Sequence, residues 1–263
     1  MKPYLYIAKT KVLSALAYRF DVISEILIQC LVVIATSFFW MAAYGERQSA
    51  MGVSLEQMLT YSIMSAALSC LLTVNVEDRI IRSVRKGSVA LDMLKPVDMF
   101  GMYLAEDVGA ITISLCQKAL PLLIIASVLI KVPAPSSALY FLFFLFSVII
   151  SFLICWLISA CYAMLSFYVI SMGPLHQTKN VLIRILSGSI IPLWFFPEGL
   201  QAVFKYLPFV YIYQLPLSIY IGKLELSDIF MQMGLQIIWL LILYVIYKMI
   251  KRKVLSNVLI QGG

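Results

Sequence analysis

Charged side chains inside apolar stretches are the first residues that could do chemistry. Lys118 is the only basic residue well inside such a stretch, and a lysine at the centre of a bilayer costs about 2.5–3.5 kcal/mol. Its ammonium needs a carboxylate such as Glu25 or Glu106, a route along its own stem to the interface, or an anionic substrate. A buried charge network of Glu25, Lys118 and Arg184 is one expected arrangement, and interfacial anchoring of Arg184 is the alternative.

Polar side chains also recur at helical spacing. One stripe, spaced by three, four and four residues, consists of Ser62, Ser65, Ser69 and Thr73. A second stripe, on an earlier apolar stretch, consists of Gln29, Thr36 and Trp40. Each stripe falls on one helical face, which could line a polar path for a substrate or could pack closely against another helix. Both interpretations remain open.

Motifs for catalysis are absent from the sequence. It contains no G-x-x-x-x-G-K-[ST] phosphate loop, no H-E-x-x-H zinc helix and no G-x-S-x-G nucleophile turn. His176 is the only histidine, and the five cysteines lie inside apolar runs, where they behave as small hydrophobes. We expect no enzymatic activity, no catalytic residue, no bound metal and no cofactor on this chain.

The composition indicates what kind of fold must position these residues. Of the 263 residues, 62% are hydrophobic and only 13% are charged, against about 25% charged in soluble domains. The mean hydropathy is +0.97. The sequence therefore predicts an all-α membrane protein in which residues 1–263 form a single transmembrane domain.

Apolar runs of about twenty residues, the length that crosses about 30 Å of hydrocarbon, define the spans. The predicted spans are residues 22–44, 58–76, 108–130, 138–166, 181–196 and 229–247. Between the last two, residues 197–220 carry Pro197, Pro208 and Pro216, which disfavour one straight helix. We expect short re-entrant helices there, outside the membrane-crossing set and packed against protein.

Charge placement predicts the orientation. Six spans with both termini inside put most lysines and arginines in cytoplasmic segments, as the positive-inside rule requires. The net charge of +7 is explained this way, so no nucleic-acid partner is expected. Before the first span, Leu5, Ala8, Val12 and Leu16 recur at helical spacing, which predicts an amphipathic helix on the inner leaflet. A frayed tail is the alternative.

Residues 77–94, after the second span, form what we call the coupling element. Ile80, Ile81 and Val84 make a short apolar face that we expect to need a cover from outside the chain. The basic residues around it are Arg79, Arg82, Arg85 and Lys86. A protein partner or anionic lipid could cover this element, and Gly87 and Pro96 bracket a stiff turn into span three.

The layout resembles the permease subunits of bacterial ATP-binding-cassette exporters of the type-2 permease family. The resemblance rests on the six spans, the amphipathic helix and the proline-broken stretch of residues 190–200. It also rests on a glycine-leucine-proline pattern made by Gly87, Leu91, Leu94, Pro96 and Val97.

This resemblance implies an inner-membrane permease that pairs with a second permease, identical or related, and docks two separate ATPase subunits. ATP and magnesium would be bound by those subunits. The coupling residues would be Arg79, Ile80, Ile81, Arg82, Val84, Arg85, Gly87, Leu91 and Leu94. Besides the two polar stripes, the substrate path would include Ser187 and Trp194.

Two other functional classes compete. A secondary transporter or channel not driven by ATP usually shows internal repeats and ionisable groups near the midplane, and no convincing repeat is found. A membrane-embedded enzyme acting on lipid would need clustered histidines or carboxylates in the spans. The few charges in the spans favour a hydrophobic or amphipathic substrate such as a drug, a peptide or a lipid.

Overall fold

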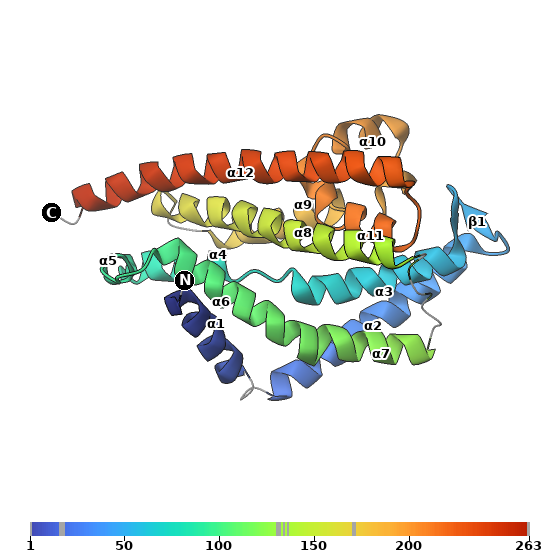
Figure 1. The fold of residues 1–263 in the computed structure, drawn as a ribbon, viewed down its shortest axis with the longest axis horizontal. Coiled ribbons are helices and arrows are strands. Elements are labelled where there is room, and N and C mark those ends of the chain that lie inside the picture. The colour runs from blue at the N-terminus through green and yellow to red at the C-terminus, as the bar shows by residue number, and fades with distance from the viewer. Residues whose placement is uncertain are drawn as a thin grey trace.

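Long helices dominate the molecule. The computed structural model describes residues 2–15, 19–129, 133, 135, 137–169 and 172–261, and its long helices run roughly along its long axis (Figure 1). Within these described residues, five helical segments, some of them made of consecutive elements, are long and apolar enough to cross a membrane. They are Val22–Tyr44, Leu55–Arg85, Met99–Val128, Ala138–Phe167 and Leu226–Val254. The fold is therefore that of an all-α membrane protein.

The elements follow one another in chain order, with short helices between the long ones. The first half contains α1 (Lys2–Ala15), α2 (Arg19–Tyr44), β1 (Ser49–Ala50), β2 (Val53–Ser54), α3 (Leu55–Leu71), α4 (Val76–Arg85), α5 (Val89–Met93), α6 (Met99–Ser114), η1 (Leu115–Ala119) and α7 (Leu120–Leu129). The second half contains α8 (Ala138–Met164), η2 (Leu165–Phe167), α9 (Gly173–Leu186), η3 (Leu193–Phe195), α10 (Glu198–Phe204), η4 (Pro208–Tyr211), α11 (Gln214–Tyr220) and α12 (Leu226–Gln261).

A tight hairpin turns the chain back after α2. Strands β1 and β2 pair antiparallel, and Met51 and Gly52 between them have φ of 52° and 72°, as a two-residue type I′ turn requires. Ser54 then caps α3, because its hydroxyl accepts the N–H of Gln57 while the Gln57 side chain accepts the N–H of Ser54.

A short helical hairpin, α4 and α5, separates α3 from the next long helix. Asp98 caps that helix by accepting the N–H of Gly101 at 2.8 Å. Helices α6 and α7 are joined by a π-helical turn, η1, which carries Lys118. Turns of this kind are rare and are frequently found at functional sites.

The chain becomes irregular after α9. This helix has 14 residues, so it is about 21 Å long, too short to cross about 30 Å of hydrocarbon alone. Gly188 follows with φ of 78°, and Pro192 cannot donate a backbone hydrogen bond. The short helices η3, α10, η4 and α11 then lead to α12.

Both terminal helices reach the end of the molecule where α4 and α5 lie (Figure 1). The N–H of Asp98 donates to the hydroxyl of Tyr4 on α1 at 3.2 Å, and its carboxylate pairs with Lys251 on α12 at 2.5 Å. Helix α1 packs closely on α6, because a Cβ added at Gly109 would lie 2.6 Å from the carbonyl oxygen of Ala8.

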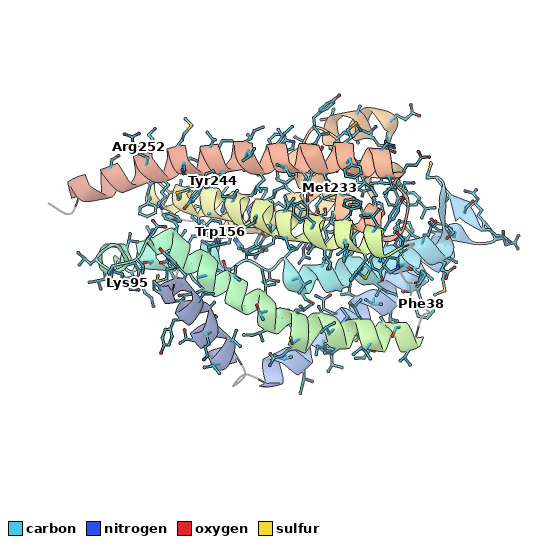
Figure 2. All side chains as sticks on the ribbon, viewed as in Figure 1. Phe38, Lys95, Trp156, Met233, Tyr244 and Arg252 are labelled. Atoms are coloured by element: carbon cyan, nitrogen blue, oxygen red, sulfur yellow. The ribbon has the colours of Figure 1, made fainter. Side chains whose placement is uncertain are left out.

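The main core lies where α3, α8, α11 and α12 meet. Side chains fill the space between these helices, and Trp156 and Met233 are buried there, whereas Phe38 lies exposed on α2 (Figure 2). Gln236 on α12 is fully buried, and its amide nitrogen donates to the carbonyls of Ser147 and Tyr211, each at 3.0 Å. Such interhelical hydrogen bonds hold membrane helices together.

The observed helices correct several predicted bounds. The second span was expected over residues 58–76, but α3 ends at Leu71 and the chain restarts as α4 at Val76. The third span begins earlier, at Met99 rather than 108. The fifth was expected over residues 181–196, whereas α9 runs from Gly173 to Leu186 and the chain is irregular after it. The count of six spans therefore stays a prediction.

The flanking segments also differ in detail from expectation. Residues 2–15 are helical, but Leu5, assigned to the apolar face, is 68% exposed, while Ala8 and Val12 are half-buried. Leu16 lies outside the described residues. Residues 197–220 hold the short helices α10, η4 and α11 rather than one straight helix.

Candidate functional site

The coupling element folds as two short helices joined by a glycine turn. Gly87 adopts φ of 67°, a left-handed conformation that ends α4 at little cost for glycine only. Asp92 on α5 accepts hydrogen bonds from Ser83 on α4 and Tyr103 on α6, each at 2.9 Å. Burial raises the pKa of Asp92, but hydrogen bonds from Lys95, Ser83 and Tyr103 outweigh it and hold the pKa below its usual range.

A buried carboxylate fixes the start of α4. Asp107 on α6 is fully buried and accepts the N–H groups of Asn75 and Val76 at 3.2 and 3.1 Å. It also accepts the indole N–H of Trp156 on α8 at 3.2 Å. Because the first N–H groups of a helix have no partner within it, Asp107 ties α4 to α6 and α8.

Arg79 completes this anchor instead of facing outward. Its guanidinium pairs with Glu106 at 2.9 Å and with Asp107 at 3.3 Å, and its side chain is 13% exposed. The sequence predicts Arg79 among the charges on the free surface of the coupling element. The structure uses it internally, because Asp107 would otherwise be a buried charge without a counter-ion.

A second buried carboxylate joins α4 to α9. Glu77 is 2% exposed and contacts both the His176 ring and the Lys179 ammonium. Asn180 lies 2.9 Å from the other ring nitrogen of His176. Sequence reasoning missed this cluster, and its only signal was the spacing of three residues between His176 and Lys179, which places both on one face of a helix.

The apolar face of the coupling element is covered by the chain itself. Ile80 and Ile81 are 1% and 9% exposed, and Ile80 belongs to the main core. The expectation that a partner must cover these two residues is wrong, because α4 packs against α6 and α8. Among the residues of the element whose burial is described, the exposed ones are Asp78, Arg82, Arg85, Lys86, Gly87, Leu91 and Leu94.

Lys118 has a carboxylate partner, which offsets the free-energy cost of its charge within the membrane. Lys118 on η1 forms an ion pair with Glu25 on α2, and this was one of the alternatives predicted. Arg184 is exposed and, among the described residues, forms no ion pair with either of them. The predicted three-residue network therefore reduces to the Glu25–Lys118 pair.

The hydroxyl stripe on α3 is mostly engaged in packing. Ser65 is buried and donates to the carbonyl of Ser189 at 2.7 Å. Ser62 and Ser69 are half-buried and donate to carbonyls of their own helix. Thr73 lies beyond the end of α3, and it donates to the carbonyl of Ser69 at 3.0 Å.

The stripe on α2 is divided between packing and surface. Trp40 is buried, with its ring 5.0 Å from that of Phe195 on η3. Thr36 donates to the carbonyl of Val32 at 2.8 Å, and Gln29 is half-buried. Of the predicted path residues, Trp40 thus meets the same short helix that carries Trp194.

The helix break around Gly188 gathers the remaining predicted path residues. The Tyr61 hydroxyl donates to the Gly188 carbonyl at 2.6 Å, and the Gln214 side-chain oxygen accepts the N–H of Leu193 at 3.1 Å. Ser187 is fully buried, and its carbonyl accepts the N–H of Gln214. These bonds satisfy irregular backbone from within the protein, as a segment at membrane depth requires.

Trp194 differs from its neighbours at this break. The centroid of its ring lies 5.4 Å from that of the Tyr61 ring, and the Lys223 ammonium lies over the Trp194 ring, 4.5 Å from its centroid. Its buried indole N–H has no acceptor within the described part of the chain. It is the one predicted path residue here with an unused hydrogen-bond donor among those described.

Comparison with known proteins identifies the family. A sequence model of a family described as "ABC-2 family transporter protein" matches residues 30–262. A search of curated proteins and a search of solved structures find no match. The matched region contains the coupling element, its buried anchors and every long helix from α3 to α12. The chain therefore belongs to the ABC-2 transporter family, and it is a membrane component of an ABC transporter.

Proposed function

We propose that this chain is the permease subunit of an ATP-driven exporter, and that α4 and α5 dock onto a separate ATPase subunit. Leu91 and Leu94 carry the proposal, because they are 66% and 81% exposed at the tip of the hairpin. Two exposed leucines beside the basic residues Arg82 and Arg85 make a small apolar patch with a charged rim, as protein interfaces do.

The inner face of the same hairpin supports a mechanical role. Asp107 connects α4 to α6 and α8, and Glu77 connects it to α9. A force on the exposed tip would therefore act on three other helices at once. The connections are buried ion pairs and hydrogen bonds, which are strongly destabilised when one partner is lost, so α4 moves with these helices rather than independently.

The assembly would contain two permeases and two ATPase subunits, which bind ATP and magnesium. The second permease is identical or related. The chain would make its fifth passage through α9 and η3, which leaves six passages and both termini on the cytoplasmic side of a bacterial inner membrane. The basic residues of the hairpin and of the end of α12 support this orientation. The substrate would be hydrophobic or amphipathic.

Docking is tested by co-purification. The tagged permease is extracted in mild detergent from its own host membranes, and the ATP hydrolysis that accompanies it is measured. Leu91→Asp with Leu94→Asp should abolish that hydrolysis while the permease still inserts, because two carboxylates would be buried unpaired in the interface. Tyr206→Asp is the matched control, at a residue 79% exposed that follows α10, a helix away from the α4–α5 hairpin in Figure 1.

Persistent ATP hydrolysis after the leucine changes would show that the docking assignment is wrong. The basic residues of the hairpin would then be lipid anchors, the alternative that the sequence left open. Loss of hydrolysis in the Tyr206 variant as well would mean that the assay reports damage to the whole permease rather than docking.

A further inference from the structure

The His176 ring touches a buried carboxylate on another helix. Its Nδ1 atom contacts Glu77 on α4, and the Lys179 ammonium contacts the other oxygen of the same carboxylate. Because an ionised carboxylate only accepts hydrogen bonds, Nδ1 must carry a proton whether the ring is neutral or charged. The contact with Glu77 therefore fixes the neutral tautomer, and Nε2 is the nitrogen that can gain or lose a proton.

The second ring nitrogen of His176 has a partner that suits both protonation states. The amide nitrogen of Asn180 lies 2.9 Å from Nε2, so it can donate a hydrogen bond to the neutral ring. When Nε2 carries a proton, a half-turn of the amide brings its oxygen to the same place, where it accepts. The ring can therefore take up a proton without losing a hydrogen bond and without leaving a donor or acceptor unpaired.

The ring lies at the edge of this cluster, where protons can reach it. The side chain of His176 is 29% exposed, whereas that of Lys179 is 12% exposed. Helix α8 ends at Met164, on the side of the molecule where α4 and α5 lie (Figure 1), and α9 begins soon after it, at Gly173. That side is cytoplasmic in the proposed orientation, so the ring can exchange protons with the cytoplasm.

Three charges act on the ring, and the nearest of them favours its charged form. Lys179 is a like charge, and the positive end of the α9 dipole lies at Gly173, three positions before His176. Both oppose a charge on the ring. The Glu77 carboxylate touches the ring directly, and because Coulomb energies fall with distance, its attraction outweighs the two repulsions.

The neighbouring groups on α4, α6 and α8 leave this balance unchanged. On α8, Cys155 and Tyr162 lie close enough to Glu77 to interact with its charge, and thiols and phenols of ordinary pKa are neutral below about pH 8. The Arg79 guanidinium is engaged by Glu106 and Asp107. Short helix η2, between α8 and α9, carries no titratable side chain. The charge of the cluster is therefore set by the protonation of one imidazole.

From this geometry we infer that His176 is a proton-sensitive clamp, which holds α9 more firmly on α4 when its ring is charged. Helix α4 packs mainly on α6 and α8, and its link with α9 runs through Glu77. A charge-assisted hydrogen bond is about twice as strong as a neutral one, so acidification strengthens this link. The clamp is a property of this chain alone. Its effect on transport, through the helix break that follows α9, rests on the proposed function.

The protonation of the ring can be observed directly, because His176 is the only histidine in the sequence. The full-length permease is produced with isotope-labelled histidine and a tag free of histidine, and it is placed in nanodiscs without an ATPase subunit. Nuclear magnetic resonance then follows the ring from about pH 8 to about pH 5, the range in which imidazoles titrate. We expect a neutral ring with its proton on Nδ1 at the upper limit and a charged ring at the lower limit. A neutral ring with its proton on Nε2, or a ring whose charge stays constant, would overturn the inference.

The distance between α4 and α9 tests the clamp itself. Spin labels are attached in a cysteine-free background at Arg82→Cys on α4 and Val181→Cys on α9, two exposed positions. The ratio of short to long distances should rise about fivefold between about pH 8 and about pH 5, the difference between a charge-assisted and a neutral hydrogen bond. His176→Gln keeps a hydrogen-bonding side chain that cannot titrate in this range, so it should abolish the response.

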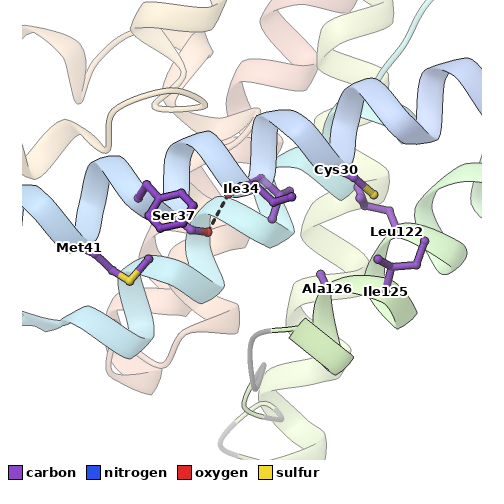
Figure 3. A pocket seen from close by; sticks show the side chains of 9 residues that line it. Cys30, Ile34, Ser37, Met41, Leu122, Ile125 and Ala126 are labelled. Atoms are coloured by element: carbon purple, nitrogen blue, oxygen red, sulfur yellow. Dashed lines mark hydrogen bonds between the residues drawn. The ribbon is translucent and has the colours of Figure 1, made fainter.

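A second variant and a second label pair complete the test. Lys179→Gln leaves His176 as the one basic partner of Glu77 among the described residues, so it should enlarge the pH response. Labels at Met41→Cys and Ile125→Cys lie across the apolar groove between α2 and α7, whose lining holds no charged side chain (Figure 3), and their distance should not depend on pH. An α4–α9 distance that ignores pH in both the parent and the Lys179 variant would overturn the inference, and so would a response that persists in His176→Gln.

Discussion

Near the coupling element, a single buried carboxylate can hold several helices together. Each oxygen of Asp107 has two donors: one faces Asn75 N–H and Arg79, and the other faces Val76 N–H and the Trp156 indole. A charged oxygen pair suits four donors, because an ionised carboxylate only accepts hydrogen bonds. Any side chain with an N–H at this place would point a donor at two other donors.

Asp107→Asn should therefore destabilise the permease by about 3 kcal/mol, as breaking a buried ion pair does. The change keeps the shape of the side chain but replaces one accepting oxygen with an NH₂ group. The free energy of unfolding in mixed detergent micelles measures it. Asp78→Asn, at an exposed residue of α4, should change that free energy little; equal stabilities of both variants would contradict the role given to Asp107.

For single residues, sequence reasoning succeeded where placing a charge in an apolar stretch had an evident free-energy cost. Lys118 had to find a carboxylate or water, and Glu25 was a predicted partner. It failed for Ile80 and Ile81, because their short apolar face looked too narrow to be buried by the chain itself. Burial of that face depends on α6 and α8 arriving from distant parts of the sequence, and local periodicity holds no information about that.

At the scale of elements, the break after α9 is the main departure from a simple bundle. Hydropathy alone predicted a span over residues 181–196, because the residues on both sides of the break are apolar. Gly188 has left-handed φ, and a Cβ there would lie 2.4 Å from the side-chain oxygen of Gln214. The break is therefore specified by backbone conformation and by a contact with α11.

Gly87 and Gly188 both have left-handed φ, so alanine variants at these two positions separate the cost of the backbone conformation from the cost of the contact with Gln214. Gly87→Ala and Gly188→Ala both place a side chain at positive φ, which costs about 1 kcal/mol. At Gly87 no atom lies within 4 Å of the added Cβ, but at Gly188 the Gln214 oxygen must move, so we expect a total loss of about 3 kcal/mol there. Thermal unfolding of both variants decides it, and similar losses would mean that the Gln214 contact yields freely.

At the scale of the whole molecule, the sequence predicted the all-α membrane class, and the structure bears it out. Segments 22–44 and 138–166 lie inside observed helices over their whole length. The polar cluster of Glu77, His176 and Lys179 was not predicted, since Glu77 lies about 100 positions before the other two residues. The number of crossings is the property that neither hydropathy nor helix length decides, because α9 is too short and the chain continues beyond it irregularly.

Side-specific labelling decides between five and six crossings. The N and C ends of the chain and the α4–α5 hairpin lie towards one end of the molecule, and the β1–β2 hairpin and α10 lie towards the other (Figure 1). In a cysteine-free background, Lys86→Cys and Arg252→Cys should react only from the cytoplasmic side, and Arg47→Cys and Lys205→Cys only from outside. Permeabilised cells, in which all four should react, are the control.

External labelling at 252 with internal labelling at 86 would require an odd number of passages between them. In that case α9 and η3 would not complete a crossing, and α12 would have to enter the membrane from the cytoplasmic side. The basic end of α12, with Lys248, Lys251, Arg252 and Lys253, would then lie outside against the positive-inside rule, which is why six passages are expected.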